Sequence, residues 1–508
     1  MSSKIYSVEL SGLDGHLVEI EVDNRPHGHP IFAIVGLPDT AVQEARERVI
    51  SAVKNSGYTF PRGRVIANLA PADLKKMGSR YDLAIAIGTV KIYENIPDER
   101  ISDTIFLGEL SLNGEVRAVN GVLASVEFAK KRGFKQVIIP ITNACEAALV
   151  PDIKIIPVKH LREAVLHLYD ELCALPVSPP DKQSTKRNIV DMSSIKGQAQ
   201  AKRALEIAAA GGHNILLNGA PGAGKTYMAK ALVGILPEMT HEEMMEVTKI
   251  YSVAGLLPKD QPLITSRPFR PVHHTASAIS IVGGGNIPGP GEITLAHRGV
   301  LFLDEIAEFP SNVLEVLRQP MEDRCITVSR AKATITYPAQ FILIATMNPC
   351  PCGYYGVENS SKICNCPAWK IQRYQKKISG PLMDRIDMHL NIQPVEYHDL
   401  FITADAESSE KVQLRIQNAA DMQYERFKGL GFKKNSEMDN AVLNKLCPLD
   451  KKGEELLEQA IDKFNLSARA YFRIIKLART IADLEGKDVI KNSHVAEALQ
   501  YRNKNPEI

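Results

Sequence analysis

The octapeptide GAPGAGKT, residues 219–226, constrains the fold of this chain more than any other feature. It matches the pattern G-x-x-x-x-G-K-[ST], and it lies between the apolar run NILLN and the helical pattern TYMAKALVGIL. In this context the glycines let backbone amides turn toward bound phosphates, and the N-terminus of the following helix adds positive potential. The sequence therefore predicts a strand, a phosphate-binding loop and a helix.

The residues of this loop have separate expected roles. Lys225 is expected to neutralise the β and γ oxygens of ATP, and Thr226 is expected to offer its hydroxyl to Mg²⁺. ATP and Mg²⁺ are therefore the predicted cofactors. The predicted nucleotide-binding residues are Gly219, Ala220, Pro221, Gly222, Ala223, Gly224, Lys225, Thr226 and Asp304.

Two further apolar runs end in polar residues that suit ATP hydrolysis. The run GVLFLDE ends in Asp304, which is predicted to hold Mg²⁺ through water, and Glu305, which is predicted to polarise the attacking water. The run ILIATMNP ends in Asn348, which could position that water near the γ-phosphate. In isolation, such acids are often surface residues and such an asparagine is often a turn former. The phosphate-binding loop is what favours the catalytic interpretation.

Two arginines are candidates for contacts with nucleotide. Arg385 follows a Gly-Pro break, and it is predicted to reach the γ-phosphate held by a neighbouring subunit. An ion pair with Asp384 or Asp387 is the alternative. Arg469 lies in the first turn of a helix that Ser467 is predicted to cap, where a cation opposes the helix dipole. A cation at this position favours an anionic partner, namely a nucleotide that Arg469 contacts from the lid, the helical C-terminal region. The alternative is that Arg469 is an ordinary surface arginine.

A predicted hairpin carries basic residues at its tip. The alternating runs CITVS and ATITY flank Arg330 and Lys332. A Gly/Pro-rich insertion, PVHHTASAISIVGGGNIPGPGEITLAHRG, occurs earlier in the chain. A ring-shaped ATPase that presents such a hairpin to its channel would contact DNA phosphates without sequence preference. An ordinary solvated turn is the alternative.

Four cysteines form two C-x-C pairs within residues 350–366. The chain has no apolar N-terminal signal region and no run of membrane-spanning length, so we expect a cytoplasmic protein with reduced thiols. Four thiolates would hold a structural Zn²⁺ and leave no open coordination position, although C-x-C is tighter than the usual spacing. Free thiols or a redox-labile disulfide are the alternatives. The predicted zinc ligands are Cys350, Cys352, Cys364 and Cys366.

The chain of 508 residues is too long for a single core. Mixed strand and helix patterns occupy 1–172, and a polar, Pro-rich linker occupies 173–190. The apolar runs of 191–400 predict an α/β domain with a mostly parallel sheet, and 401–508 has helical periodicity throughout. Because the net charge is only +2, binding to nucleic acid would require a local basic surface.

Five segments together carry a resemblance to a known family: GAPGAGKT, PGEITLAHRGVLFLDE, ATMNPCPCGYYG, SGPLMDRIDMHL and LSARAYFRIIKLARTIAD. Over essentially its whole length the chain resembles the ComM/YifB family of magnesium-chelatase-like AAA+ proteins of bacteria. The resemblance implies an AAA+ P-loop core with a helical lid, in which the two insertions are the helix-2 insert and the pre-sensor hairpin. It also implies that Asn348 is sensor 1, Arg385 the trans-acting finger and Arg469 sensor 2.

The function implied by this resemblance is that of a hexameric, ATP-driven DNA motor. Such a helicase extends heteroduplex by branch migration, in homologous recombination during natural transformation. The alternative is an ATPase of the magnesium-chelatase or MoxR type that remodels a protein partner.

The N-terminal region resembles the proteolytic domain of Lon proteases through VIANLAPADLKKMGSRYDLAIAIG and GELSLNGEVRAVNGVLASVEFAKKRGFKQVIIP. Lon chemistry needs a serine nucleophile that a lysine activates. The serine position falls at Arg80 and the lysine position at Leu123, while the adjacent Ser79 has no evident base. We therefore expect a non-proteolytic domain that binds DNA or assists ring assembly, which argues against an ATP-dependent protease.

Overall fold

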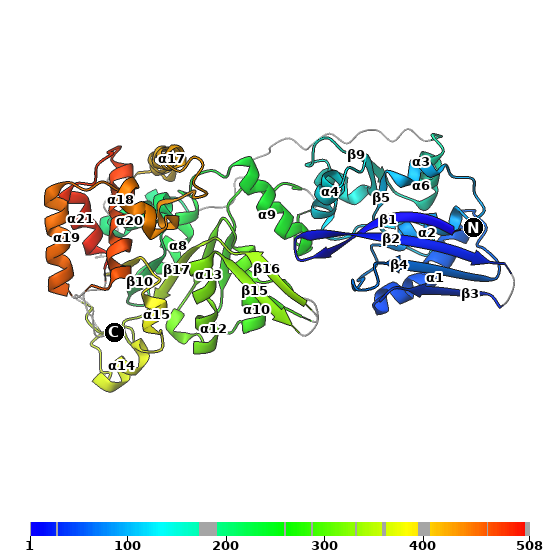
Figure 1. The fold of residues 1–508 in the computed structure, drawn as a ribbon. Helices are drawn as coiled ribbons and strands as arrows, with labels where there is room; N and C mark the ends of the chain where they lie inside the picture. The colour runs from blue at the N-terminus through cyan, green and yellow to red at the C-terminus, as the bar shows by residue number, and fades with distance from the viewer. Residues whose placement is uncertain are drawn as a thin grey trace. The chain divides into compact units, whose positions relative to one another are not determined.

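The computed structural model resolves the chain into two compact units (Figure 1). One unit contains Met1–Gln183 and Met244–Thr265, and the other contains Ser184–Glu243 and Ser266–Ile508. Lys332, most of the predicted linker and the predicted boundary at residue 400 lie outside the described residues. The described ranges are 2–26, 29–171, 190–258, 261–285, 288–330, 333–357, 362–394, 407–464 and 466–502.

The first unit is built on a seven-stranded mixed sheet with the order β3-β4-β2-β1-β5-β8-β9. Its longest pairing is antiparallel, between β1 and β2, and it places Ile5 opposite Ile20. Val18, Ile20 and Val22 are buried on one face of β2, as the alternating sequence predicts. The strands are β1 Ser2–Ser11, β2 Asp14–Arg25, β3 Ile31–Val35, β4 Arg64–Ala70, β5 Thr104–Phe106, β8 Gln136–Pro140 and β9 Lys154–Val158.

Helices pack on this sheet, and α2 is the most deeply placed of them. Every residue of α2 is buried, and the helix contacts β1, β2, α1 and α6. A short antiparallel pair, β6 Glu109–Leu110 with β7 Val116–Arg117, lies beside the main sheet. The helices are α1 Thr40–Asn55, α2 Asp82–Val90, α3 Asp98–Ser102, α4 Val122–Lys131, α5 Ala144–Ala147 and α6 Leu161–Leu168.

The segment Met244–Thr265 completes the first unit, although it comes from the middle of the predicted ATPase range. It contains most of α9, His241–Val253. The Lys249 ammonium pairs with Glu127 at 2.8 Å, and the amide of Gly121 donates to the Ser252 carbonyl at 3.0 Å. Leu263 is buried in the same apolar cluster as α4. The range 191–400 is therefore divided between the two units.

The second unit is built on a five-stranded sheet in which all neighbouring strands are parallel. The strand order is β11-β14-β17-β10-β18, so β10 lies between two strands that follow it in the chain. The carboxyl end of such a strand is a usual place for a ligand crevice. The strands are β10 Ile215–Gly219, β11 Phe269–Val272, β14 Val300–Leu303, β17 Ile342–Met347 and β18 Met388–Ile392.

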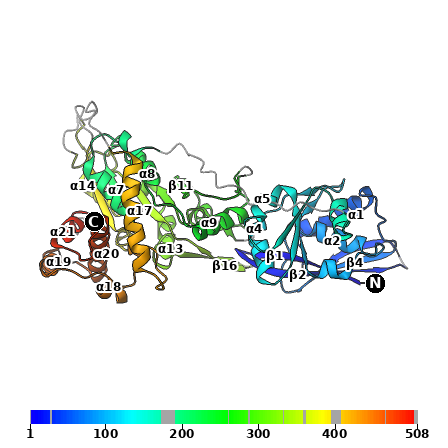
Figure 2. The same cartoon turned by 90° about the horizontal axis from the view of Figure 1, so that it is seen from above.

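Helices of the core and the lid share one apolar cluster with this sheet. Figure 2 shows α17 beside α7, which it contacts, and α20 also packs on α7. The core helices are α7 Ala199–Gly211, α8 Lys225–Val233, α10 Ala278–Val282, α11 Glu292–Leu295, α12 Ser311–Val316, α13 Arg318–Asp323, α14 Ala368–Gln375 and α15 Gly380–Met383. The lid helices are α17 Ser409–Arg426, α18 Asn440–Leu446, α19 Lys451–Phe464, α20 Ala468–Leu484 and α21 Asn492–Gln500.

Two small hairpins project from the core of the second unit. The antiparallel pairing of β15, Cys325–Arg330, with β16, Ala333–Pro338, confirms the hairpin predicted around Arg330. The Gly/Pro-rich insertion contains a second pair, β12 Gly283–Gly284 with β13 Gly289–Pro290. Among the helices that the structure describes, none combines the length and apolarity needed to cross a membrane.

Candidate nucleotide site and cysteine cluster

The predicted phosphate-binding loop connects β10 to α8, as the sequence pattern requires. Gly222 and Gly224 have φ values of 81° and 83°, in the left-handed region that favours glycine. A Cβ atom on Gly219 would lie 2.5 Å from the Ile392 carbonyl oxygen, whereas one on Gly222 would meet nothing within 4 Å. The loop is thus closely packed where it leaves the strand and open at its turn.

The Lys225 ammonium is buried and is held by neutral oxygen atoms. Its Nζ donates to the carbonyl oxygens of Gly219 at 2.5 Å and Ala220 at 3.0 Å, and to the side chain of Asn348 at 2.8 Å. Burial lowers the pKa of Lys225, while the nearby carboxylates of Asp304 and Glu305 oppose this effect. A phosphate would be a stronger partner for this ammonium than any of the three neutral oxygens.

The predicted magnesium ligands lie next to each other. The Thr226 hydroxyl donates to Asp304 Oδ2 at 3.3 Å, and the Thr346 hydroxyl donates to Asp304 Oδ1 at 2.5 Å. A hydroxyl beside a carboxylate is the hard oxygen set that Mg²⁺ prefers, so these residues fit the predicted ion. The sequence analysis did not predict that Thr346 would donate a hydrogen bond to Asp304. Its only signal is a hydroxyl within the apolar run ILIATM.

Glu305 and Asn348 reach the same edge of the sheet as Lys225. Glu305 has a φ of 54°, an unusual value for a residue other than glycine, and its amide donates to the Thr346 hydroxyl at 2.9 Å. Such strained positions cluster at functional sites. The structure therefore brings the predicted loop lysine, the two acids and the polar residue after β17 together at the carboxyl ends of three parallel strands.

Arg385 and Arg469 lie at the opposite edge of this sheet. Because Met388 pairs with Ile215 in the parallel register of β10 and β18, Arg385 precedes the amino ends of the strands. Arg385 Nη2 lies 2.6 Å from Glu322 Oε1, and Arg469 Nη2 lies 2.7 Å from the same oxygen. The structure thus brings these two arginines together, and it places neither beside the loop lysine.

The two arginines differ in exposure. Arg385 is only 5% exposed and also donates to the Pro381 carbonyl at 2.6 Å, whereas the Arg469 side chain is 49% exposed. Ser467 caps α20 as predicted, since its hydroxyl accepts from the Ala470 amide at 3.2 Å. Asp387 forms an ion pair with Arg473 at 3.3 Å, and the carboxylate that pairs with Arg385 in the described residues is Glu322.

Glu322 is a residue that the sequence analysis missed. The hydrogen bond from Arg385 is the main cause that lowers the pKa of Glu322, and the charges of Arg385 and Arg469 act in the same direction. In sequence, this glutamate is one of several polar residues in RQPMEDR. Nothing local distinguishes it from a solvated surface acid, because both of its partners come from distant parts of the chain.

Arg330, the described member of the predicted DNA-binding pair, ends β15 and is exposed. A Cβ atom on Gly284 would lie 2.8 Å from Arg330 Nη2, so the arginine lies against the glycine-rich hairpin. The Tyr337 hydroxyl also donates to the Pro288 carbonyl at 2.7 Å. The two predicted insertions are therefore in contact. Lys332 lies outside the described residues.

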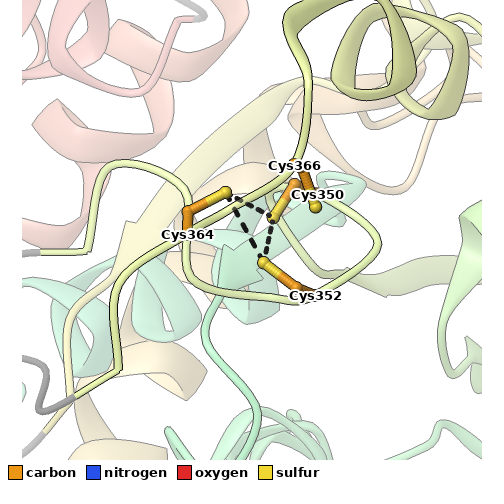
Figure 3. Close-up of side chains that lie close together, drawn as sticks. All are labelled: Cys350, Cys352, Cys364 and Cys366. Carbon is orange, nitrogen blue, oxygen red and sulfur yellow. Dashed lines mark hydrogen bonds between the residues drawn. The ribbon is translucent and has the colours of Figure 1, made fainter.

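The four predicted zinc ligands converge, with all Sγ atoms within 4.8 Å of one another (Figure 3). The Sγ of Cys350 lies 3.2 Å from Cys352 and 3.7 Å from Cys364, and the last two are 3.5 Å apart. A tetrahedron with Zn–S bonds of about 2.3 Å has sulfur atoms about 3.8 Å apart. A hydrogen bond from the Tyr354 backbone is the largest cause lowering the pKa of Cys352, to about 6. The cluster fits Zn²⁺, and all four residues are free cysteines.

The Lon-like positions of the first unit have structural partners. Arg80 Nη2 donates to the Asn120 carbonyl at 3.0 Å, and Leu123 is fully buried in an apolar cluster. The Ser79 hydroxyl donates to the Glu109 carboxylate. The serine hydroxyl is therefore bonded to an acid, and the position where Lon chemistry needs a lysine is part of the core.

Comparisons with known proteins agree with this arrangement. The family "Magnesium chelatase, subunit ChlI" matches residues 191–400, its C-terminal family matches 406–502, and "Subunit ChlI of Mg-chelatase" matches 18–143. An archaeal Lon protease of Methanocaldococcus jannaschii is 37% identical over 93 residues, which are 18% of this chain and 14% of that protein.

Two bacterial relatives match nearly end to end. The competence protein ComM of Haemophilus influenzae is 41% identical over 98% of this chain and 97% of its own length. The protein YifB of Escherichia coli strain K12 is 40% identical over 98% of this chain and 97% of its own length. With the P-loop core, the helical lid and the Lon-like first unit, these matches show that the chain belongs to the ComM/YifB family of magnesium-chelatase-like AAA+ proteins.

Proposed function

We propose that this protein is an ATP-hydrolysing motor that works as a hexameric ring on DNA. The observation that carries the proposal is the separation of two charged sites on one sheet. Lys225 lies at the carboxyl ends of the strands, and Arg385 lies beyond their amino ends. One subunit cannot bring both groups to the same phosphate, so a complete ATP site needs two subunits, as a closed ring provides at every interface.

Within one subunit, the loop edge would bind ATP and prepare water for attack. The loop amides and Lys225 bind the phosphates, and Asn348 becomes available as the phosphate replaces it on the ammonium. Thr226 and Asp304 would hold Mg²⁺, which neutralises phosphate charge when bound. Glu305 then accepts a proton from the attacking water, which Asn348 orients.

At the other edge, Glu322 would hold the trans-acting groups until a neighbouring nucleotide arrives. Its carboxylate binds both Arg385 and Arg469. The γ-phosphate of a neighbouring subunit carries more negative charge than one carboxylate, so both guanidinium groups can transfer to it. On this proposal Arg385 is the finger and Arg469 is sensor 2, and both act across the subunit boundary.

DNA is the proposed substrate of the motor. Support comes from the exposed Arg330 at the end of its hairpin and from the near full-length match to a protein named for competence. Arg330 and Lys332 would contact backbone phosphates in the channel. The motor would extend heteroduplex by branch migration in homologous recombination, during natural transformation, and it would work in the cytoplasm where that DNA is processed.

We further propose that Cys350, Cys352, Cys364 and Cys366 hold one structural Zn²⁺ per subunit. The loop that they close leaves the end of β17 directly after Asn348. A metal can fix the shape of such an insertion without an apolar core of its own. Zinc would thus keep the segment after Asn348 in place and take no part in hydrolysis.

Stimulation of ATP hydrolysis by DNA tests this function. Turnover by the full-length protein is measured alone and with single-stranded, duplex and four-way branched DNA at fixed salt. We expect stimulation that is strongest with branched DNA, together with ATP-dependent movement of the branch point. If none of these DNAs changes turnover, a protein-remodelling ATPase becomes the better interpretation.

A further inference from the structure

The only tryptophan of the chain is exposed. Trp369 lies in α14 with 63% of its surface accessible, while Ile371 and Tyr374 of the same helix are buried. Figure 1 shows α14 at the periphery of the second unit. A tryptophan buries more apolar area than most side chains, so one left exposed beside a well-packed face suggests a surface that binds a flat partner.

The surroundings of Trp369 are strongly cationic. Residues 362–377 contain no aspartate or glutamate. Ile363, with 84% of its surface accessible, adds an exposed apolar group to this segment, and Tyr355, with 52%, lies before it in the chain. The cationic residues of the range are Lys362, Lys370, Arg373, Lys376 and Lys377, and all five are exposed.

This combination fits single-stranded nucleic acid better than it fits another protein. Proteins that bind single strands combine cations along the backbone with aromatic side chains on which bases stack. Interfaces between proteins, in contrast, are depleted in lysine, and four of these five cations are lysines. A second copy of this chain is therefore the weaker candidate for covering Trp369.

The inner face of α14 contacts the ATPase machinery. The Gln375 side chain donates to the Pro349 carbonyl at 3.1 Å, and the Lys377 ammonium lies 3.3 Å from Glu308. Burial raises the pKa of Tyr374, and the nearby backbone of Asn348 opposes that rise. One short helix thus has an exposed aromatic and cationic face and a buried face against the residue that contacts Lys225.

The segment from Cys350 to Cys366, here called the cysteine loop, precedes α14 and contacts the phosphate-binding loop. A Cβ atom on Gly353 would lie 2.5 Å from Pro221 Cδ, so these two loops touch. Movement of the segment from Cys350 to α14 would therefore affect both the phosphate loop and Asn348. This gives a physical route from the exposed face to the ATP site.

We propose that the outer face of α14 binds single-stranded DNA, with a base stacked on Trp369 and backbone phosphates on Lys370 and Arg373. The proposal rests on the proposed function, because it takes DNA as the substrate of the motor. In this proposal, a strand bound to α14 shifts the cysteine loop and α14, and this shift changes the position of Asn348.

The fluorescence of the native protein tests this proposal directly. Because Trp369 is the only tryptophan, its emission reports this surface alone. The full-length protein is titrated with oligothymidine of about 15 nucleotides, near the upper site size of single-strand binding modules. A sugar-phosphate strand of the same length without bases is the matched ligand. We expect oligothymidine to quench the emission and the abasic strand to leave it nearly unchanged.

Substitutions then separate stacking from charge. Trp369→Ala should weaken oligothymidine binding, measured by anisotropy, by roughly fivefold to a hundredfold, and Trp369→Phe should retain most of the affinity. Tyr424→Ala is the matched control, because Tyr424 is an aromatic residue that is 61% exposed on α17 and has the Lys428 ammonium over its ring. Thermal unfolding confirms that the variants fold. Basal ATP turnover should be unchanged in Trp369→Ala.

Two results would overturn the proposal and leave the motor intact. One is unchanged Trp369 emission while anisotropy shows saturation with oligothymidine. The other is equal affinity of the native protein and Trp369→Ala for oligothymidine. In both cases DNA would still stimulate ATP turnover, so the site would be wrong and the function would stand. If no DNA binds or stimulates turnover, the proposed function fails as well.

Discussion

The two units of the molecule each surround a cation with oxygen atoms of the chain, and they do so in opposite ways, with Lys225 buried and Arg80 half-buried. In the second unit, Lys225 is held by neutral oxygens beside an open turn at Gly222. In the first unit, Arg80 donates to the Asn120 carbonyl and faces the carboxylate of Glu9. Burial raises the pKa of Glu9 to about 7, and the Arg80 charge opposes that rise.

The two cations differ in whether a ligand could replace the protein atoms that contact them. Around Lys225, a phosphate can take the place of Asn348, and the open turn leaves room for it. Around Arg80, the chain itself fills the space, since Asn120 lies against Gly255 of the segment Met244–Thr265. Burial of a charge therefore does not identify a functional site. A buried charge with exchangeable partners does so more reliably.

The largest expected effect comes from Arg385, which is buried like Lys225 and, like Lys225, has a partner that a phosphate could replace. Arg385→Ala should lower the kcat for ATP by about 10³-fold to 10⁵-fold, the usual contribution of a trans-acting arginine. Arg415→Ala is the control, because Arg415 pairs with Glu206 and Glu407 away from both sites. It should change kcat by less than about threefold. Steady-state turnover is the measurement.

A mixing experiment tests whether Arg385 acts on a neighbour. Arg385→Ala subunits keep a complete loop, and Lys225→Ala subunits keep the arginine. In a random equal mixture, about a quarter of ring interfaces would combine both intact groups and recover turnover. Mixtures no more active than the separate variants would show that Arg385 is buried for structural reasons.

Glu305 should have the next largest effect. Glu305→Gln keeps the side-chain size and removes the proton acceptor, so kcat should fall by about 10²-fold to 10⁴-fold while ATP still binds. Lys225→Ala should instead weaken nucleotide binding itself. Turnover and the Kd of a fluorescent ATP analogue distinguish the two. Normal turnover in Glu305→Gln would mean that its strained backbone serves structure and not water activation.

Loss of zinc should have an intermediate effect. Replacing Cys350 and Cys352 together by serine should remove about one zinc per subunit, since two remaining thiolates hold the ion far less well than four. ATP binding should persist and DNA-dependent activity should fall. Cys145→Ser is the control, because Cys145 is an exposed cysteine outside the cluster. Elemental analysis without chelator is the measurement, and four titratable thiols without stoichiometric metal would contradict the zinc assignment.

The smallest effect is expected in the first unit. Ser79→Ala removes a hydrogen bond to Glu109 and should change the free energy of unfolding by only about 1 kcal/mol. ATP turnover should be unchanged, and neither the native protein nor the variant should degrade casein, with or without ATP. Proteolysis that is lost in Ser79→Ala would show that Ser79 is a nucleophile and that the first unit holds a catalytic site.

Much of the nucleotide site could be predicted because its residues are adjacent in sequence to elements that fix their direction. Asp304, Glu305 and Asn348 each follow an apolar strand, and parallel strands bring their carboxyl ends together. The cysteines could be predicted because their spacing is itself a ligand pattern. The hairpin at Arg330 could be predicted from alternation alone.

The rest depends on contacts between distant parts of the chain. Thr346 contacts Asp304 and Glu322 contacts Arg385, and no local sequence pattern predicts either contact. The apolar residues of Met244–Thr265 indicate that this segment is buried, but not which unit it is buried in. Periodicity predicts which face of an element is covered, and the identity of the covering element comes from the whole fold.

The path of Met244–Thr265 has a consequence for the order of folding during synthesis. The first unit requires Leu263 in its core, so it cannot finish folding until the ribosome has passed the phosphate-binding loop and α9. The amino-terminal unit is therefore not the first to be completed independently. A fragment that ends at residue 171 would expose the apolar surface of α4, and a fragment that starts at residue 190 would expose Leu263. Neither half is a natural unit for separate expression.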